Sequence, residues 1–205
     1  MSPTVVVLAR DPRRGKTRLR SVLEPAGRER LALAMFDDVI AAARSTRWPV
    51  LVITDSRAIA ARARVAGVGA LVVPARGTRD AARHGARRAA RDGAEAVLIV
   101  PADVPLLRTA DLRRIATAGR HAAVVVVPDR ERSGTNALYV RPPERIAPRF
   151  GHGSFAAHRA AAGGDGRVVT IARLALDVDT PADLAALRRA RRHARGRTRV
   201  ALVRD

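Results

Sequence analysis

The chain of 205 residues contains no cysteine, and only 2% of its residues are aromatic. The absence of cysteine excludes a disulfide scaffold, a zinc finger and a thiol nucleophile. So few aromatic side chains argue against a protein that binds single-stranded nucleic acid by stacking bases on aromatic rings. The sequence also lacks an apolar run of the roughly 18 residues that span a bilayer, and its start lacks the charged and apolar regions of a signal peptide. We therefore expect a globular, cytoplasmic protein.

Acidic residues are few: the chain has 19 Asp and Glu but 39 Lys and Arg, so its formal net charge is +20. Lys16 is the sole lysine, Asn136 is the sole asparagine, and glutamine is absent. This composition is typical of a bias towards GC-rich codons, which raises arginine throughout a protein. A polyanion-binding protein remains an alternative, since arginine attracts phosphates without any motif. We expect one domain over residues 1–192 and a basic tail over residues 193–205.

Short apolar runs alternate with stretches of helical periodicity along the chain. The predicted strands are residues 5–9, 50–53, 70–73, 96–100, 122–127, 137–140 and 168–171. The predicted helices are residues 28–44, 58–66, 80–92 and 110–118, with a last helix beginning at Thr180. Strands that are apolar throughout indicate a mostly parallel sheet covered on both faces, so we expect a three-layer α/β/α sandwich. Such sheets bind ligands beyond the carboxyl ends of their strands.

The loop after the first predicted strand is rich in basic residues and contains Gly15-Lys16-Thr17. A P-loop would need glycine at the position of Arg10, so the match to that motif is incomplete. Lys16 offers a compact charge and Arg18 a guanidinium that can bind two oxygens, which suits a triphosphate. The alternative is a solvated basic loop.

Three aspartates are candidates for holding a metal ion. Asp103 directly follows the predicted strand 96–100, while Asp177 and Asp179 lie two positions apart on one face of an extended segment. Mg²⁺ binds one or two carboxylates together with substrate phosphates, so these residues suit it. The alternative roles are helix caps, with Asp103 before one helix and Asp179 or Thr180 before the last.

Two glycine-containing strings are candidates for binding a small anionic substrate. Gly134-Thr135-Asn136 precedes a predicted strand and offers small hydrogen-bonding groups. The string from Gly151 to Ser154 opens a predicted helix, whose free N–H groups bind anions. Each string also occurs in ordinary turns. The five histidines show no spacing that indicates a metal site or a catalytic triad.

Five strings occur in one order along the chain: Lys16-Thr17-Arg18-Leu19, Pro101-Ala102-Asp103-Val104-Pro105-Leu106-Leu107, Gly134-Thr135-Asn136-Ala137-Leu138, Phe150-Gly151-His152-Gly153-Ser154-Phe155 and Leu176-Asp177-Val178-Asp179-Thr180-Pro181. With them the chain resembles, over about residues 4–187, the 2-phospho-L-lactate or phosphoenolpyruvate guanylyltransferase family of coenzyme F-420 biosynthesis. The resemblance implies a nucleotide-diphospho-sugar transferase-like fold. It also implies transfer of GMP from GTP to a three-carbon phosphoacid, with release of pyrophosphate.

The resemblance further implies a role for each matching residue. The expected Mg²⁺ ligands are Asp103, Asp177 and Asp179. The expected GTP-phosphate and catalytic residues are Arg10, Lys16 and Arg18, with Asp103 also catalytic. The expected acceptor-binding residues are Thr135, Asn136, Gly151 and Ser154. Phosphoenolpyruvate is the preferred acceptor because the composition is typical of GC-rich bacteria.

Two positions depart from the family pattern and leave alternatives open. Arg10 stands where the family usually has lysine, and Gly77-Thr78-Arg79 stands where the family tends to have Gly-Leu-Asn. The second departure leaves the preference for guanine open, since that loop is expected near the base. The alternative acceptors are 2-phospho-L-lactate and 3-phosphoglycerate. A related nucleotidyl- or glycosyltransferase is the alternative enzyme.

Overall fold

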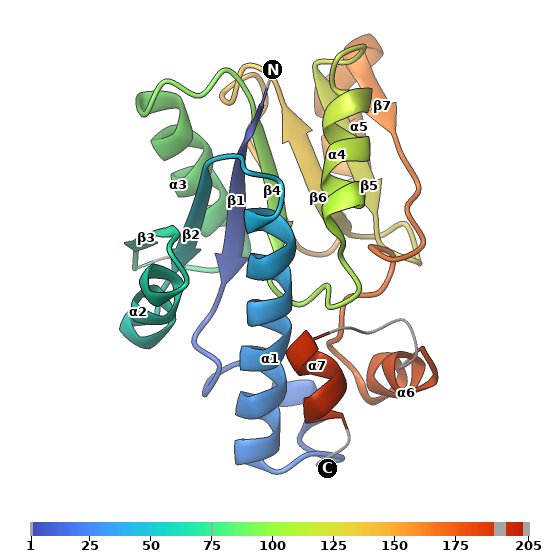
Figure 1. Cartoon of the computed structure of the whole chain (residues 1–205). Coiled ribbons are helices and arrows are strands. Elements are labelled where there is room, and N and C mark those ends of the chain that lie inside the picture. Colours follow the sequence, from blue (N-terminus) through green and yellow to red (C-terminus); the bar gives the residue numbers. More distant parts are fainter. Residues whose placement is uncertain (1, 75, 191–195, 203–205) are drawn as a thin grey trace.

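The protein, described here by a computed structural model over residues 2–74, 76–190 and 196–202, is built around one seven-stranded sheet (Figure 1). The strands lie in the order β3-β2-β1-β4-β6-β5-β7. They are β1 (Thr4–Ala9), β2 (Val50–Thr54), β3 (Gly69–Val72), β4 (Val97–Pro101), β5 (Val124–Pro128), β6 (Thr135–Val140) and β7 (Gly166–Val168). Only β6 runs antiparallel to its neighbours, so the predicted mostly parallel sheet is confirmed.

Helices cover both faces of the sheet, which confirms the three layers. The helices are α1 (Pro25–Arg44), α2 (Arg57–Val65), α3 (Thr78–Arg91), α4 (Thr109–Ala118), α5 (Ser154–Ala162), α6 (Pro181–Arg189) and α7 (Gly196–Ala201), with short 3₁₀ turns η1 (Thr17–Leu19) and η2 (Gly163–Asp165). Residues of α1, α2 and α4 share one core cluster, and residues of α3 and α5 share another on the opposite face.

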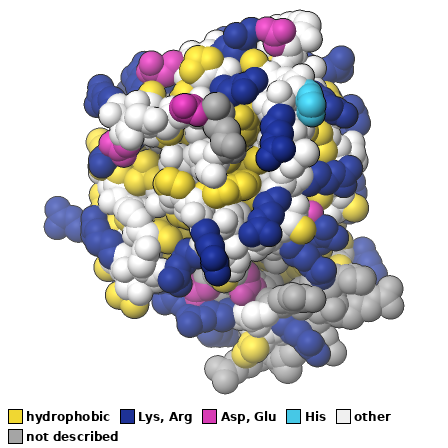
Figure 2. Space-filling model, turned by 45° about the horizontal axis from the view of Figure 1, so that its top comes forward, with side chains coloured by type: hydrophobic (Ala, Val, Ile, Leu, Met, Phe, Trp, Pro, Cys, Tyr) yellow, Lys and Arg dark blue, Asp and Glu magenta, His cyan; other side chains and the backbone are white. Residues whose placement is uncertain are grey.

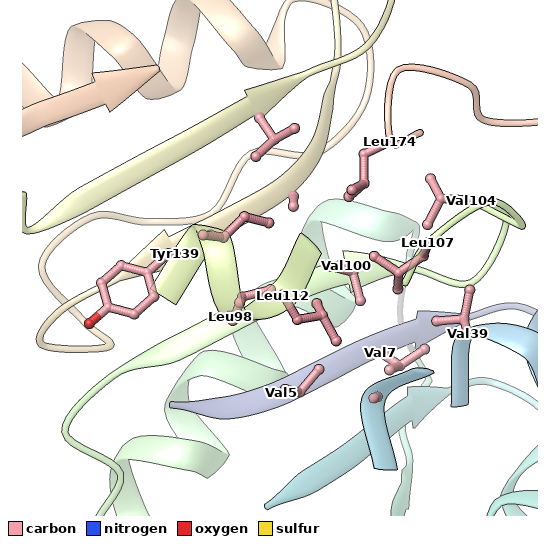
Figure 3. Close-up of a cluster of buried hydrophobic side chains, with 14 of the residues drawn as sticks. Val5, Val7, Val39, Leu98, Val100, Val104, Leu107, Leu112, Tyr139 and Leu174 are labelled. Carbon is pink, nitrogen blue, oxygen red and sulfur yellow. The ribbon is translucent and has the colours of Figure 1, made fainter. Parts of the chain in front are cut away.

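The alternation of β1 shows why the sheet needs both layers. Val5 and Val7 point into the cluster under α1 and α4, whereas Val6 and Leu8 point into the cluster under α3. Figure 3 shows Val5 and Val7 along β1, with Val7 beside Val39 of α1. Burying such a side chain contributes about 1.5–3 kcal/mol relative to leaving it in water. A strand that is apolar on both faces is therefore stable only between two layers of helices.

The last predicted strand, residues 168–171, is wrong in its bounds. β7 covers Gly166–Val168, and the chain then leaves the sheet edge. Val169 and Ile171 are buried in the cluster beneath α4, where Leu174 also packs. The Val169 N–H still donates to the Val126 carbonyl of β5 (3.0 Å), and beyond it the burial of these side chains in the core decides the path of this segment.

A third apolar cluster lies beyond the carboxyl edge of the sheet and joins the two ends of the chain. Its members are Leu19, Leu23, Leu31, Met35, Leu106, Val178, Leu184, Leu187 and Leu202. They come from η1, α1 and α6, from the segments that precede α1, α4 and α6, and from the residue that follows α7. This cluster therefore anchors both the basic loop before η1 and the aspartate segment before α6.

Part of the predicted basic tail is a packed helix. Asp38 of α1 accepts hydrogen bonds from the backbone N–H groups of Arg197 (2.9 Å) and Thr198 (2.9 Å) at the start of α7. The Arg197 guanidinium also pairs with Asp37 at 2.9 Å. Residues 193–195 and 203–205 of that tail lie outside the described residues. The division after residue 192 stays a prediction.

Basic side chains are spread over the face drawn in Figure 2 instead of forming one stripe. That distribution agrees with arginine enrichment throughout the chain. None of the helices in residues 2–74, 76–190 and 196–202 has the length and apolar character needed to cross a membrane.

Replacing Asp38 with alanine should loosen α7, because the carboxylate receives two N–H groups at the start of that helix. We expect faster amide hydrogen exchange in residues 196–202 and a loss of about 1 kcal/mol in the free energy of unfolding. Asp92→Ala is a suitable control, since the Asp92 side chain makes an exposed ion pair with Arg88. Unchanged exchange in residues 196–202 would contradict this account of the tail.

Candidate active site

The basic loop between β1 and α1 turns its one lysine inwards. Lys16 has a left-handed backbone conformation (φ 54°) at the start of η1. This conformation costs a non-glycine residue roughly 1–2 kcal/mol. Leu19 in the same turn is fully buried in the third cluster, which holds the turn in place. The Lys16 side chain, only 9% exposed, therefore extends along the carboxyl edge of the sheet.

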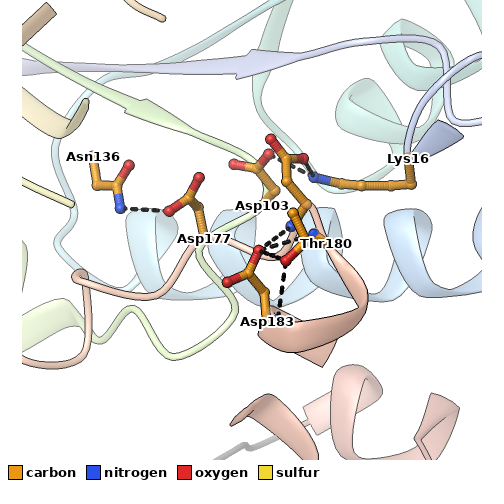
Figure 4. Close-up of polar contacts among 7 residues, drawn as sticks. Lys16, Asp103, Asn136, Asp177, Thr180 and Asp183 are labelled. Atoms are coloured by element: carbon orange, nitrogen blue, oxygen red, sulfur yellow. Dashed lines mark hydrogen bonds and ion pairs between the residues drawn. The ribbon is translucent and has the colours of Figure 1, made fainter. Parts of the chain in front are cut away.

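Lys16 bridges two of the predicted aspartates. Its Nζ lies 2.6 Å from Asp103 Oδ2 and 2.7 Å from Asp179 Oδ1 (Figure 4). Burial lowers the pKa of Lys16, but the charges of the two carboxylates outweigh it and hold the pKa above its usual value. Lys16 is therefore a cation fixed at this point.

The segment that carries Asp177 and Asp179 is placed by the residue between them. Val178 is fully buried in the third cluster, and its N–H donates to the Asp103 carbonyl at 3.1 Å. Because neighbours alternate along an extended segment, both aspartates turn away from that cluster. Thr180 caps α6, as its hydroxyl accepts from the N–H of Asp183 at 3.3 Å. The predicted cap at Thr180 is confirmed.

The two aspartates of this segment differ in their surroundings. Burial and the charge of Asp103 raise the pKa of Asp177, although Asn136 donates to Asp177 Oδ1 at 3.1 Å. Burial also disfavours ionised Asp179, but the Lys16 charge outweighs it and lowers the pKa of Asp179. Lys16 thus offsets the charge of Asp179, whereas the repulsion between Asp103 and Asp177 is not offset.

The chemistry of these carboxylates fits a hard divalent cation, although they are not a complete cage. Within the part of the chain that is described, no three acidic or histidine side chains form a ready metal site. Lys16 already takes one oxygen each of Asp103 and Asp179. Asp103 and Asp177 remain as the pair whose mutual repulsion a cation would relieve, and Mg²⁺ commonly uses one or two carboxylates plus substrate phosphates.

A cavity of about 360 Å³ opens beside Lys16. Of the predicted residues, Arg10, Lys16, Arg18, Asp103 and Asp179 line it. Arg10 and Arg18 are exposed, so both are free to turn towards a ligand. The same cavity is bounded by Gly77 and Thr78 at the start of α3, from the loop expected near a nucleotide base. Its volume falls in the range of small-molecule sites.

The remaining predicted residues gather on the neighbouring part of the sheet edge, around the start of β6. Val127 pairs with Ala137 but Pro128 pairs with Thr135, so Asn136 is an extra residue in a β-bulge. The bulge lets two consecutive side chains reach different partners. Asn136 donates to the Leu174 carbonyl (2.7 Å) and to Asp177, whereas Thr135 contacts α5. Asn136 thus links the two parts of the site.

Gly151 and Ser154 lie where α5 begins. Gly151 has φ 107° and Gly153 has φ 73°, backbone conformations that favour glycine, and the N–H of Ser154 donates to the Gly151 carbonyl at 3.1 Å. The Ser154 side chain is buried, yet its Oγ has no hydrogen-bond partner among the described residues. A buried hydroxyl without a partner is costly, which indicates that a ligand completes it.

Sequence reasoning missed His158, one helical turn after Ser154. Its imidazole is fully buried, with Nδ1 2.9 Å from Thr135 Oγ1 and Nε2 accepting from the Arg149 N–H at 2.8 Å. The i, i+4 spacing from Ser154 was the available signal, because it puts both side chains on one face of a helix.

Curated relatives resemble the chain over most of its length. A phosphoenolpyruvate guanylyltransferase from Rubrobacter xylanophilus is 41% identical over 192 residues, covering 91% of this chain and 94% of the relative. One from Sphaerobacter thermophilus is 35% identical over 177 residues, covering 84% and 86%. A 3-phospho-D-glycerate guanylyltransferase from Colwellia psychrerythraea is 31% identical, covering 91% of each.

Solved structures share the fold. A Desulfovibrio desulfuricans protein described as a nucleotide-diphospho-sugar transferase has a TM-score of 0.79 at 16% identity, covering 100% of this chain and 95% of its own. A Mycobacterium tuberculosis protein crystallised with manganese has a TM-score of 0.54 at 20% identity, covering 91% and 98%. The expected nucleotide-diphospho-sugar transferase-like fold is confirmed.

The family described as guanylyl transferase CofC like matches residues 4–195. That range contains the lysine-bridged carboxylates, the cavity beside them and the residues at β6 and the start of α5. The chain is a nucleotidyltransferase and belongs to the CofC-like guanylyl transferase family.

Proposed function

We propose that the protein transfers GMP from GTP to phosphoenolpyruvate and releases pyrophosphate, as a step of coenzyme F-420 biosynthesis in the cytoplasm. The observation that carries the proposal is Lys16, a buried cation bonded to Asp103 and Asp179 at the wall of the cavity. A triphosphate needs fixed positive charge and a hard cation at one place, and this edge offers both. The nucleotidyltransferase domain is proposed to cover residues 1–192.

The reaction is a displacement at the α-phosphorus of GTP. A phosphate oxygen of the acceptor forms the new P–O bond while the bond to the bridging oxygen of pyrophosphate breaks. The acceptor phosphate is largely ionised at pH 7, so it attacks without a general base. The demand on the protein is therefore to position two anions and offset their repulsion.

Basic residues of the cavity meet that demand. Two unit charges about 4 Å apart repel by roughly 4 kcal/mol at an effective dielectric constant of 20. Lys16 is proposed to bind the phosphates from its buried position, and Arg18 and Arg10 from the exposed rim. A guanidinium binds two phosphate oxygens at once, so Arg18 suits the charge that develops on the leaving pyrophosphate.

Asp103 and Asp177 are proposed to hold a divalent cation, Mg²⁺, with Asp179 beside them and paired with Lys16. When bound, this ion polarises phosphoryl oxygens and neutralises their charge. Asn136 orients Asp177 through its amide, and Val178 fixes the spacing of the segment to Asp103.

The acceptor is proposed to bind between β6 and α5. Thr135 offers a hydroxyl, Ser154 an unpartnered hydroxyl, and the glycines before α5 offer backbone N–H groups. These donors suit the carboxylate and phosphate of a three-carbon phosphoacid. Phosphoenolpyruvate is preferred because the two most similar relatives described above are named for it. The alternatives are 3-phosphoglycerate, for which one relative is named, and 2-phospho-L-lactate.

Asp103→Asn should lower kcat on the order of a thousandfold, because it removes charge from the place where metal and Lys16 meet. The thermal midpoint should fall as well, because the buried Lys16 keeps only Asp179 as a partner, so turnover is measured at a temperature where the variant is folded. Pyrophosphate release from GTP and phosphoenolpyruvate measures the rate, and Asp92→Asn is the matched exposed control. Near-normal turnover in Asp103→Asn would refute the site.

A panel of four nucleoside triphosphates against three phosphoacids tests the substrates. We expect pyrophosphate release to be fastest with GTP and phosphoenolpyruvate, with ATP poorer by about a hundredfold. Release only with another phosphoacid would replace the acceptor and keep the reaction. No release with any pair, together with retained binding of polyphosphate, would favour the polyanion-binding alternative.

A further inference from the structure

His158 is a buried imidazole with both ring nitrogens engaged. It is 0% exposed, Nδ1 lies 2.9 Å from Thr135 Oγ1, and Nε2 lies 2.8 Å from the Arg149 backbone nitrogen. The Phe150 ring packs against it edge to face, with centroids 5.7 Å apart. The imidazole is therefore held in one orientation.

The backbone amide of Arg149 decides which ring nitrogen carries the proton. An amide N–H can only donate, so Nε2 must present its lone pair. A neutral imidazole then carries its proton on Nδ1, and Nδ1–H donates to Thr135 Oγ1. The opposite tautomer would direct two hydrogens at each other.

The same reasoning sets the direction of the Thr135 hydroxyl. Since Oγ1 accepts from His158, its own hydrogen is left to donate elsewhere. Ser154 lies one helical turn before His158 in α5, and its hydroxyl is buried and without a partner among the described residues. The Thr135 hydroxyl, held on β6 by His158, and the Ser154 hydroxyl, one helical turn before His158, are thus two groups that can donate to a ligand that accepts hydrogen bonds.

We propose that His158 is a positioning residue that makes the Thr135 hydroxyl a hydrogen-bond donor to the anionic acceptor, an inference that rests on the proposed function. A carboxylate or phosphate accepts hydrogen bonds only, so a hydroxyl that presented a lone pair would repel it. The Arg149 N–H fixes the tautomer of His158, and His158 then donates to Thr135 Oγ1. This chain of hydrogen bonds, called the relay below, keeps the hydroxyl hydrogen of Thr135 directed at the acceptor.

The imidazole stays neutral over the physiological range. Burial, aided by the charge of Arg149, lowers the pKa of His158 to about 4. The direction of the relay is therefore constant near neutral pH.

Two substitutions of His158 separate positioning from stability. Asn places an amide N–H near the position of Nδ1, so it can still donate to Thr135 but leaves the Arg149 N–H unpaired. Gln places its carbonyl near the position of Nε2, so it satisfies Arg149 but gives Thr135 no donor. Each variant loses one buried hydrogen bond, so their stabilities should fall by similar amounts.

We expect His158→Gln to raise KM for phosphoenolpyruvate about tenfold and to leave KM for GTP within about twofold. His158→Asn should recover most of that loss. In a Thr135→Val background, His158→Gln should have no further effect on KM, because the hydroxyl it directs is gone. His121→Gln, at an exposed histidine, is the matched control.

The tautomer is measured directly by long-range ¹H–¹⁵N correlation spectra, with His158 assigned by its loss in His158→Gln. We expect the Nδ1–H form, unchanged between pH 6 and 8. The Nε2–H form, equal effects of Asn and Gln on KM, or additive effects of Thr135→Val and His158→Gln would each overturn the inference. An unaffected KM in Thr135→Val would instead refute the proposed acceptor pocket, and the inference with it.

Discussion

The ion pairs of Lys16 with Asp103 and Asp179 are the interaction on which the rest of the site depends. They bring together the loop after β1, the end of β4 and the segment before α6. A buried ammonium is costly unless it is paired, so the fold must supply both carboxylates. The result is positive charge held rigidly at the edge of an acidic cluster, which suits the phosphate-rich substrate proposed above.

The two parts of the site are supported by different means. The cavity beside Lys16 is shaped by apolar anchors, with Leu19 and Val178 buried in one cluster on either side of the ion pairs. The group of residues at β6 and the start of α5 is held by hydrogen bonds, and a bulge lets Thr135 and Asn136 reach different partners. Asn136 joins the parts because its amide contacts Asp177.

Sequence reasoning predicted the layers and nearly all elements, because apolar runs and helical periodicity report burial directly. It also selected Lys16, Asp103 and Asp179, which the structure brings into contact. It could not predict that Lys16 pairs with Asp103 and Asp179, two of the expected metal ligands. Lys16 and Asp179 are 163 positions apart, and a contact over that distance leaves no local pattern in the sequence. The bulge escaped for the same reason. The spacing of His158 from Ser154 was visible in the sequence, but the contacts of His158 with Thr135 and Arg149 were not.

The distance in sequence between Lys16 and Asp179 affects how the molecule is made. A chain synthesised from its N-terminus has its lysine, its first strands and most of the cavity wall before the second aspartate exists. Until that residue arrives, the lysine has only Asp103 to neutralise it, and Val178 is absent from the apolar cluster. The carboxyl edge that carries these ion pairs is thus among the last parts of the nascent protein to become complete.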